Sequence, residues 1–188
     1  MTGRRGIVAV LSGPSGVGKT TVVERLLRRP GIARSLTATT RAPRGRERDG
    51  VDYLFLDREA FEADVRRGRF LEHAVVHGNL YGTPRDGVEA VLARGEVCLL
   101  NIDVQGAESL RRSGLPVATI FLLPPSAEEL ERRLGGRATD APEETKRRLL
   151  RAKEELAEAV KFDCRVVNGD LEQAVAEIEA FLDTRRSA

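Results

Sequence analysis

The chain has 188 residues, 41% of them hydrophobic, which suits one domain, or one domain with insertions, around a sizeable core. Its formal net charge is only +2, so the whole molecule lacks the strongly basic balance of a nucleic-acid-binding protein. No apolar stretch is long enough to cross a membrane. The two cysteines, Cys98 and Cys164, lie in apolar strand-like runs without metal-site spacing, which favours buried free thiols in a reducing compartment. We therefore expect a cytoplasmic protein that binds neither membrane nor nucleic acid.

Short apolar runs alternate with amphipathic segments, which predicts an α/β fold with a parallel sheet covered by helices. The expected strands cover residues 6–12, 97–103, 117–123 and 163–167. The expected helices cover residues 18–29, 85–94, 105–112, 126–134, 142–161 and 170–185. Ser126, with Glu129 three residues later, predicts a capping box at the start of one of these helices.

The first strand leads into the stretch Gly13-Pro14-Ser15-Gly16-Val17-Gly18-Lys19-Thr20, which a helix-like segment follows. This order of strand, glycine-rich turn and helix start is that of a phosphate-binding loop. The glycines let backbone N–H groups point inward, and the helix N-terminus adds positive potential. Lys19 can then reach the β- and γ-phosphates, and the Thr20 hydroxyl can ligate Mg²⁺. The alternative is a strand-to-helix turn that binds nothing, but such a turn does not need Lys19 and Thr20.

Two stretches break the alternation of strands and helices. Residues 36–86 carry short strand signals at 52–56 and 70–76, as in a small mixed insertion. Residues 127–148 are dense in arginine, and Gly135-Gly136 and Pro142 separate two helical patterns there, so the turn between them can move. An insertion on each side of a phosphate loop indicates a cleft that closes over substrates.

The first insertion begins with an arginine-containing loop. Arg41 and Arg44 are three residues apart, and Pro43 stiffens the turn between them. Two arginine forks can share one phosphate dianion, so this pair is a candidate phosphate site. A solvated basic loop is an equally good interpretation of this segment alone, and it is the better one for Arg46 and Arg48.

Residues 70–84 are interpreted as a strand, a turn and a helix start, with Glu72 between apolar neighbours. A carboxylate only accepts hydrogen bonds. Guanine presents two adjacent donors, N1–H and the exocyclic amine, whereas adenine presents an acceptor at N1 that a carboxylate repels. A buried Glu72 would therefore select guanine strongly. A salt bridge on an edge strand is the alternative.

Several other polar side chains have two interpretations each. The hydroxyls of Tyr53 and Tyr81 can bind a phosphate, or the rings can simply pack half-buried. Asp103 ends an apolar run, where it can bind a base, support the water shell of a metal, or cap the next helix. His73 and His77, the two histidines, complete no metal cluster and are interpreted as structural.

The second insertion holds a further set of arginines. Phosphoryl transfer develops charge on equatorial oxygens, and arginine is the usual neutraliser. A solvated helix face paired with neighbouring glutamates is the alternative for each of them. The set consists of Arg132, Arg133, Arg137, Arg147 and Arg148.

Together these stretches resemble the guanylate kinase family over nearly the whole chain. The matching segments, in family order, are GPSGVGKTT, TATTRAPR, DGVDYLF, FLEHAVVHGNLYGTP, NIDVQGA, LPPSAEELERRL, GRATD and VVNGDLE. The resemblance implies a P-loop NTPase core at 1–35, 87–126 and 149–188, a mixed α/β GMP-binding insertion at 36–86 and a helical lid at 127–148. It also implies transfer of the γ-phosphoryl group of ATP to GMP with Mg²⁺, in purine nucleotide metabolism.

The resemblance further implies roles for individual residues. Those implied for GMP are Arg41, Arg44, Tyr53 and Tyr81 at its phosphate and Thr37, Glu72, Thr83 and Asp103 around its guanine. Those implied for ATP are Gly13, Pro14, Ser15, Gly16, Val17, Gly18, Lys19, Thr20 and Thr21, with Thr20 also at the metal and Asn168 at the adenine. The catalytic charges would be Lys19, Arg41, Arg133, Arg137 and Arg148. The nucleophile is a phosphate oxygen that is already deprotonated, so no general-base histidine is required.

The chain departs from the family pattern at three places. Asn101 stands where the family usually has aspartate, which leaves open the group that orders the magnesium waters. Gly45-Arg46 replaces the usual Pro-Gly, and Ala138 replaces a usual glycine. None of these changes touches the residues implied for guanine.

Three other functions compete with GMP phosphorylation. The same fold can phosphorylate a sugar phosphate, but the guanine set Glu72, Thr83 and Asp103 argues against that acceptor. A peptide-binding domain related to guanylate kinases would have a degenerate phosphate loop, and here the loop is intact. An RNA-binding protein would need aromatic platforms for bases, which this sequence lacks, and the net charge is small. The sequence leaves open whether the protein is a monomer or a homo-oligomer.

Overall fold

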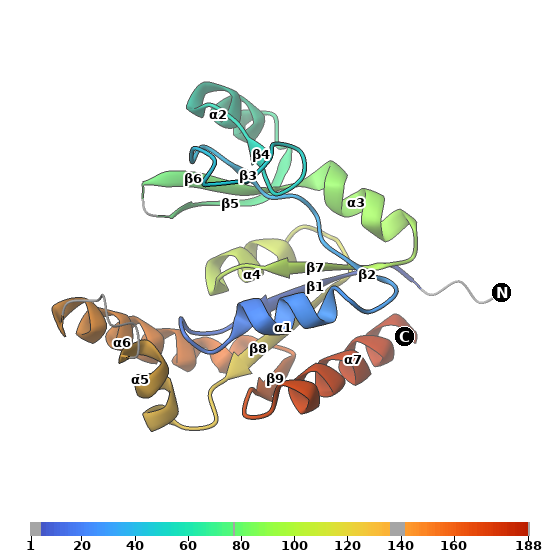
Figure 1. The fold of residues 1–188 in the computed structure, drawn as a ribbon. Helices are drawn as coiled ribbons and strands as arrows, with labels where there is room; N and C mark the ends of the chain where they lie inside the picture. Colours follow the sequence, from blue (N-terminus) through green and yellow to red (C-terminus); the bar gives the residue numbers. More distant parts are fainter. Residues whose placement is uncertain (1–4, 77, 136–141, 188) are drawn as a thin grey trace.

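The computed structural model of the chain describes residues 5–76, 78–135 and 142–187 (Figure 1). Its core is a five-stranded sheet in the order β2-β7-β1-β8-β9, in which all neighbouring strands are parallel. The central strand β1, Ile7–Ser12, pairs with β7, Val97–Asn101, and with β8, Val117–Leu123. The edge strands are β2, Ile32–Ala33, and β9, Cys164–Val167. The predicted parallel sheet is confirmed.

Helices cover both faces of this sheet, because alternate residues of the fully buried β1 belong to two separate apolar clusters. One cluster includes residues of α1, Lys19–Leu26, and of α7, Leu171–Ser187 (Figure 1). The other includes residues of α3, Arg85–Ala93, and of α4, Val104–Arg111. Across the described ranges, no helix is both long enough and apolar enough to cross a membrane.

A second sheet lies beside the core and has four strands in the order β4-β3-β6-β5 (Figure 1). Helix α2, Arg58–Arg66, packs on this sheet, with the Phe61 ring stacked on that of Phe70 at a centroid distance of 4.6 Å. The strands are β3, Ala38–Thr39; β4, Leu54–Phe55; β5, Phe70–Val76; and β6, Asn79–Pro84. The segment predicted as a small mixed insertion therefore contains a sheet of its own.

The interpretation of residues 79–84 as part of a turn is wrong, because they form strand β6. β6 pairs antiparallel with both β5 and β3, so tertiary pairing overrides the weak strand preference of Gly82 and Pro84. The predicted helix does begin next, at Arg85. The sequence analysis also missed β2 and β3, which are too short to show any periodicity, and it missed α2.

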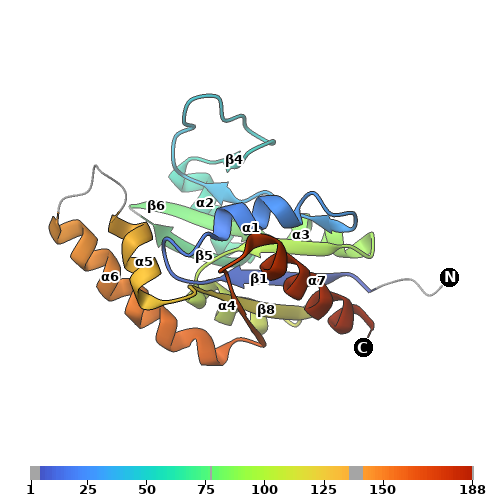
Figure 2. The same ribbon diagram turned by 60° about the horizontal axis from the view of Figure 1, so that its bottom comes forward.

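Two further helices stand at one end of the molecule, next to the turn between β1 and α1 (Figure 1, Figure 2). They are α5, Ala127–Gly135, and α6, Pro142–Ala157, and the 3₁₀ helix η1, Glu158–Lys161, follows them. Leu130 and Leu134 of α5 share a small apolar cluster with Ala152 of α6. Helices α5 and α6 therefore share a small apolar cluster, and Leu156 of α6 packs both against it and against one cluster of the sheet.

The predicted capping box at the start of α5 forms only in part. The Ser126 hydroxyl oxygen accepts the N–H of Glu129 at 3.1 Å, as expected. The carboxylate of Glu129 instead accepts hydrogen bonds from Arg132 and Arg133, each at 2.7 Å. These two guanidinium groups lower the pKa of Glu129 to about 2. The second half of the box is thus replaced by ion pairs along the helix.

Candidate active site

Strand β1 ends in the turn that the sequence predicts to be a phosphate-binding loop. Ser12 is the last residue of the strand, and Lys19 is the first residue of α1. Gly13, Gly16 and Gly18 have φ angles of 145°, 82° and 97°, a range that side chains disfavour. The turn thereby places the N-terminus of α1 at the carboxyl end of the central strand, where open α/β sheets bind their ligands.

Lys19 extends back over this loop. Its Nζ donates to the carbonyl oxygens of Gly13 and Pro14, the latter at 3.0 Å. Burial lowers the pKa of Lys19 from its ordinary value, and the carboxylate of Glu155 opposes that shift. The ammonium group is held by neutral carbonyls, so a phosphate oxygen would be a stronger partner for it. Thr20 and Thr21 follow in the first turn of α1 and are exposed.

Two of the predicted catalytic arginines lie against the loop. Arg133 of α5 donates from Nη1 to the carbonyl oxygen of Val17 at 3.3 Å. Arg148 of α6 donates from Nη2 to the hydroxyl of Ser15 at 3.2 Å. Both guanidinium groups are thus close to the place where a bound triphosphate would carry its charge. Arg137, the third of them, lies outside the described residues.

Asn168 approaches the loop from the end of β9. It is only 8% exposed, and its side-chain Nδ2 donates to the carbonyl oxygen of Val17 at 2.8 Å. Its backbone N–H donates to the carbonyl oxygen of Leu123, also at 2.8 Å, which fixes the residue between β8 and the loop. Its implied contact with adenine stays a prediction.

A cavity of about 180 Å³ lies between the loop and the end of β7. The carboxylates of Asp103 and Glu155 and the amide of Asn101 line it opposite Lys19. Oxygen donors of this kind suit Mg²⁺, which keeps several water ligands when it binds with phosphates. The residues present therefore fit a magnesium ion that arrives with a nucleotide. The full lining is Ser12, Gly13, Lys19, Asn101, Ile102, Asp103, Val104 and Glu155.

A second cavity, of about 450 Å³, lies where the smaller sheet faces the core. Asn101, Ile102 and Asp103 line this cavity and also the first one, so the two cavities meet at the end of β7. The structure brings five of the residues implied for GMP together here: Thr37, Tyr53, Glu72, Tyr81 and Asp103. Ala74 and Val76 complete the lining with apolar surface.

Glu72 is largely buried in the second cavity. Its Oε1 accepts the hydroxyl of Thr83 at 2.5 Å, and Thr83 is itself only 2% exposed. Burial raises the pKa of Glu72 above its ordinary value, the Thr83 hydrogen bond opposes that shift, and the charge of Asp103 adds to it. The carboxylate thus has a hydroxyl as its partner and faces a cavity, which favours the predicted ligand-binding role over a surface salt bridge.

Arg41 is not in the lining of this cavity but contacts Tyr53 and Tyr81, which are, and it is only 8% exposed. Its Nη1 and Nη2 donate to the two carboxylate oxygens of Glu47 at 2.9 and 3.0 Å, which raises the pKa of Arg41 above its ordinary value. Its Nε donates to the Tyr81 hydroxyl at 3.2 Å, and its Cζ lies 5.3 Å from the centre of the Tyr53 ring. Arg44 is exposed, and its backbone N–H donates to Glu47 at 2.7 Å.

Asp103 fulfils one of its predicted roles, the cap of the next helix, and its roles toward a base or a metal stay predictions. Its Oδ1 accepts the N–H of Gly106 at 2.8 Å and so caps α4, which is why β7 ends at Asn101 and not at residue 103 as predicted. The same residue lines both cavities. The cap fixes the carboxylate at the boundary between the two binding regions.

Sequence reasoning missed two acidic residues of the site, Glu47 and Glu155. Glu47 stands in a loop with four arginines, and that contrast of charge was an available signal. Glu155 lies on α6, 136 positions after Lys19 in the chain, and only the fold brings it to the phosphate loop. Each places a negative charge beside a cation that the site uses.

The remaining predicted groups lie away from the two cavities or outside the described part of the chain. His73 is exposed on β5, and His77 and Ala138 are outside the described residues. Cys98 is a buried free thiol and Cys164 a half-buried one, as expected. Among the described residues, no group of three or more His, Cys, Asp or Glu side chains could hold a metal ion by itself.

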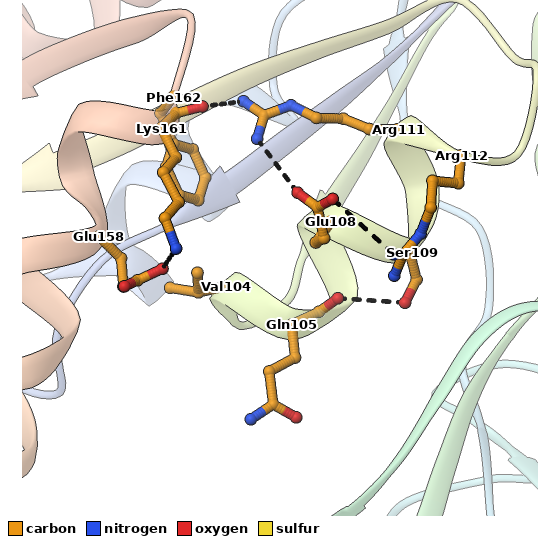
Figure 3. Close-up of a pocket in the computed structure, with 9 residues that line it drawn as sticks. All are labelled: Val104, Gln105, Glu108, Ser109, Arg111, Arg112, Glu158, Lys161 and Phe162. Carbon is orange, nitrogen blue, oxygen red and sulfur yellow. Dashed lines mark hydrogen bonds and ion pairs between the residues drawn. The ribbon is translucent and has the colours of Figure 1, made fainter.

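A separate hollow of about 400 Å³ lies on the outer side of α4, against η1 (Figure 3). Its charged side chains pair with one another: Lys161 with Glu158, and Glu108 at 3.9 Å from both Arg111 and Arg112. The phosphate loop is not part of its lining. We therefore place the candidate active site at the two adjoining cavities.

Comparison with known proteins gives one consistent result for the whole chain. A sequence model of the guanylate kinase family matches residues 5–185. The chain is 52% identical over 178 residues to the guanylate kinase of Parasynechococcus marenigrum, covering 94% of this chain and 98% of that protein. It is 50% identical over 186 residues to a guanylate kinase of Thermus thermophilus, covering 99% and 83%. The crystal structure of guanylate kinase from Anaplasma phagocytophilum superposes with a TM-score of 0.78 at 36% identity, covering 98% and 88% of the two chains.

Proposed function

The chain belongs to the guanylate kinase family, and from that membership we propose that it transfers the γ-phosphoryl group of ATP to GMP, giving ADP and GDP. It is thus an enzyme, a nucleoside monophosphate kinase. One feature supports this reaction above all: a cavity at a phosphate loop meets a cavity that holds a buried carboxylate, along the shared wall Asn101–Asp103. A donor and an acceptor nucleotide bound in these cavities would meet at their phosphates.

The acceptor base would be read mainly by Glu72. Its Oε1 already accepts the Thr83 hydroxyl, and its remaining acceptor capacity suits the adjacent N1–H and amine donors of guanine. Adenine would place an acceptor against the same carboxylate. A buried polar group left without a partner disfavours the wrong base, so this single residue can give strong discrimination.

The acceptor phosphate would bind near Arg41, which Glu47 and Tyr81 hold in one position. A guanidinium that is already fixed loses less conformational entropy when it binds a phosphate. The exposed Arg44 and the hydroxyls of Tyr53 and Tyr81 would complete this phosphate site.

The donor triphosphate would bind at the N–H groups of the loop and at Lys19. Mg²⁺, when bound with ATP, supplies positive charge that neutralises the β- and γ-phosphates. The Thr20 hydroxyl would hold the metal. Asn101, Asp103 and Glu155 line the same cavity and would hydrogen-bond the water around it.

The transfer itself needs placement and charge neutralisation. A phosphate oxygen of GMP attacks the γ-phosphorus, and the bond from that phosphorus to the bridging oxygen of ADP breaks. The attacking oxygen is already ionised at neutral pH, so no side chain has to remove a proton. Lys19, Arg133 and Arg148 would neutralise the charge on the transferring group, with Arg137 as a further candidate.

We further propose that residues 36–86 and 127–148 act as units that close on the core. The first contains its own sheet, and the α5 helix of the second packs through Leu130 and Leu134 on Ala152, just beyond that segment. Closure would exclude water from the transferring phosphoryl group and prevent its loss by hydrolysis. Two free thiols favour a cytoplasmic location, where ATP and GMP are both present.

The test is a comparison of phosphate acceptors. Purified protein would be given Mg²⁺–ATP with GMP, AMP, CMP, UMP or a phosphorylated sugar, and ADP formation would be measured. We expect turnover with GMP to exceed that with the other acceptors by about two orders of magnitude or more, because only guanine suits Glu72. Turnover with the sugar phosphate but not with GMP would contradict the proposal. So would a folded protein that turns over none of these acceptors.

A further inference from the structure

We propose that Asn168 is a positioning residue that holds the phosphate loop in its binding shape. Its role would then concern the triphosphate of any donor nucleotide and not the adenine base. This goes beyond the proposed function and differs from the adenine contact that the family resemblance implies for the same residue. It depends on that function solely for the choice of substrates in one of the two measurements below.

The contacts of Asn168 join it to the loop on one side and to the central sheet on the other. Its Nδ2 donates to the Val17 carbonyl oxygen at 2.8 Å, and its backbone N–H donates to Leu123 of β8 at 2.8 Å. The side chain of Val17 is fully buried in the apolar cluster between β1, α1 and α7. Arg133 Nη1 donates to the same carbonyl oxygen at the longer distance of 3.3 Å, so Asn168 is the nearer of its two side-chain donors. Val17 is therefore anchored at both its side chain and its carbonyl.

This anchoring fixes the direction of a phosphate-binding N–H. The Val17 carbonyl and the Gly18 N–H belong to one planar peptide unit, and in a trans peptide they point in opposite directions. Because Asn168 holds the carbonyl on its own side, the Gly18 N–H is directed to the other side. Gly18 precedes the first residue of α1, so this N–H belongs to the group at the helix N-terminus that binds phosphate.

Asn168 also packs directly against Gly18. A Cβ atom on Gly18 would lie 2.5 Å from Asn168 Nδ2, well inside contact distance. The residue has a φ of 97°, which a side chain disfavours independently. The side-chain amide of Asn168 therefore packs directly against the loop at Val17 and Gly18. A residue that served only as a base contact would not need this packing.

The first measurement uses no nucleotide. We would compare backbone ¹⁵N order parameters for residues 16–20 in the free wild-type protein and in Asn168→Asp and Asn168→Ala. A carboxylate at position 168 would face the Val17 carbonyl with two acceptors and no donor, so Asp should disturb the loop more than Ala. We expect values near the rigid level of about 0.85 in wild type and a fall toward about 0.6 in the variants.

The second measurement compares donors that share a triphosphate but differ in the base. We would determine kcat/KM for ATP and for ITP, in which a carbonyl replaces the 6-amino group of adenine. Loss of one buried hydrogen bond should lower both values about tenfold and leave their ratio unchanged. Arg165→Ala, an exposed change on the strand that ends just before Asn168, is the matched control and should change neither value.

Unchanged loop order parameters in both variants would overturn the proposal. A loss with ATP that is absent with ITP would do the same, because it would assign Asn168 to the base. If wild type has no GMP kinase activity, the proposed function fails, but the order parameters still decide the role of Asn168. Thermal unfolding of each variant would show that it is folded. If Asn168→Asp does not fold, Asn168→Ala alone is used in both measurements.

Discussion

The donor and acceptor regions of the site are built in different ways. The donor region is one continuous turn whose binding groups are mostly backbone N–H groups, fixed by glycines and by the core. The acceptor region gathers single side chains from strands β5, β6 and β7 and from the loops around them, at positions between Thr37 and Asp103. Backbone groups suit phosphate, which every nucleotide carries, whereas the identity of a base has to be read by side chains. Substitutions in the donor region should therefore impair phosphate binding and transfer, whereas substitutions in the acceptor region should impair recognition of GMP.

The largest effect is expected in the donor region. Lys19→Ala should lower kcat by about a thousandfold, because it removes a preorganised charge from the transferring phosphates. Initial rates with GMP and ATP at saturation would measure the loss, and circular dichroism would show that the fold is kept. Lys153→Ala, an exposed lysine on α6, is the matched control. Activity of Lys19→Ala close to that of wild type would refute the phosphate-loop mechanism.

A smaller but more selective loss is expected in the acceptor region. Glu72→Gln should lower kcat/KM for GMP about a hundredfold, because it replaces charge-assisted hydrogen bonds and places an N–H₂ against the donors of guanine. The KM for ATP should stay the same. Steady-state kinetics with each substrate varied in turn would test this, with Glu62→Gln, on α2, as the control. An equal rise in both KM values would argue against base reading by Glu72.

A substitution that acts indirectly in the same region should have a smaller effect on the use of GMP. Glu47→Gln should raise the KM for GMP about tenfold, because Arg41 would lose the charged partner that fixes its guanidinium group. kcat should change less than KM. If Glu47 instead competed with the phosphate of GMP for Arg41, the variant would bind GMP more tightly, and calorimetric titration would reveal the opposite sign.

The smallest expected effect is the pH dependence of stability that Glu72 causes. Its pKa in the folded protein is raised above the ordinary value of 4.5. At pH values between 4.5 and the raised pKa, the folded state therefore holds a proton that the unfolded state has released. Stability from this group is therefore fully present below 4.5 and is lost as the pH rises through the raised pKa. GMP affinity should change in the opposite direction, because binding uses the carboxylate. Denaturant unfolding at several pH values would show the decline in wild type and its absence in Glu72→Gln.

The difference between the two regions also explains what could be predicted. The phosphate loop was recognisable because strand, glycines, lysine and helix follow one another in the chain. In the acceptor region, Glu72 was singled out from its apolar neighbours, but its partner Thr83 was placed in a turn that is in fact strand β6. Glu155 was missed because it lies far along the chain from Lys19, so the pair leaves no local pattern. Glu47 was missed although it stands among arginines, because its pairing with Arg41 shows only in the fold.

The sequence by itself determined the α/β class, the parallel core, the phosphate loop and the likeness to guanylate kinases, because each depends on residues that are close together in the chain. Only the tertiary structure decided how β3, β5 and β6 pair, that the two cavities meet at the end of β7, and that Asn168 hydrogen-bonds to the loop. The physical reason is the distance along the chain over which each kind of interaction acts. Hydrophobic periodicity and turn chemistry act over a few residues, whereas strand pairing and buried hydrogen bonds join groups from distant parts of the chain only after it has folded.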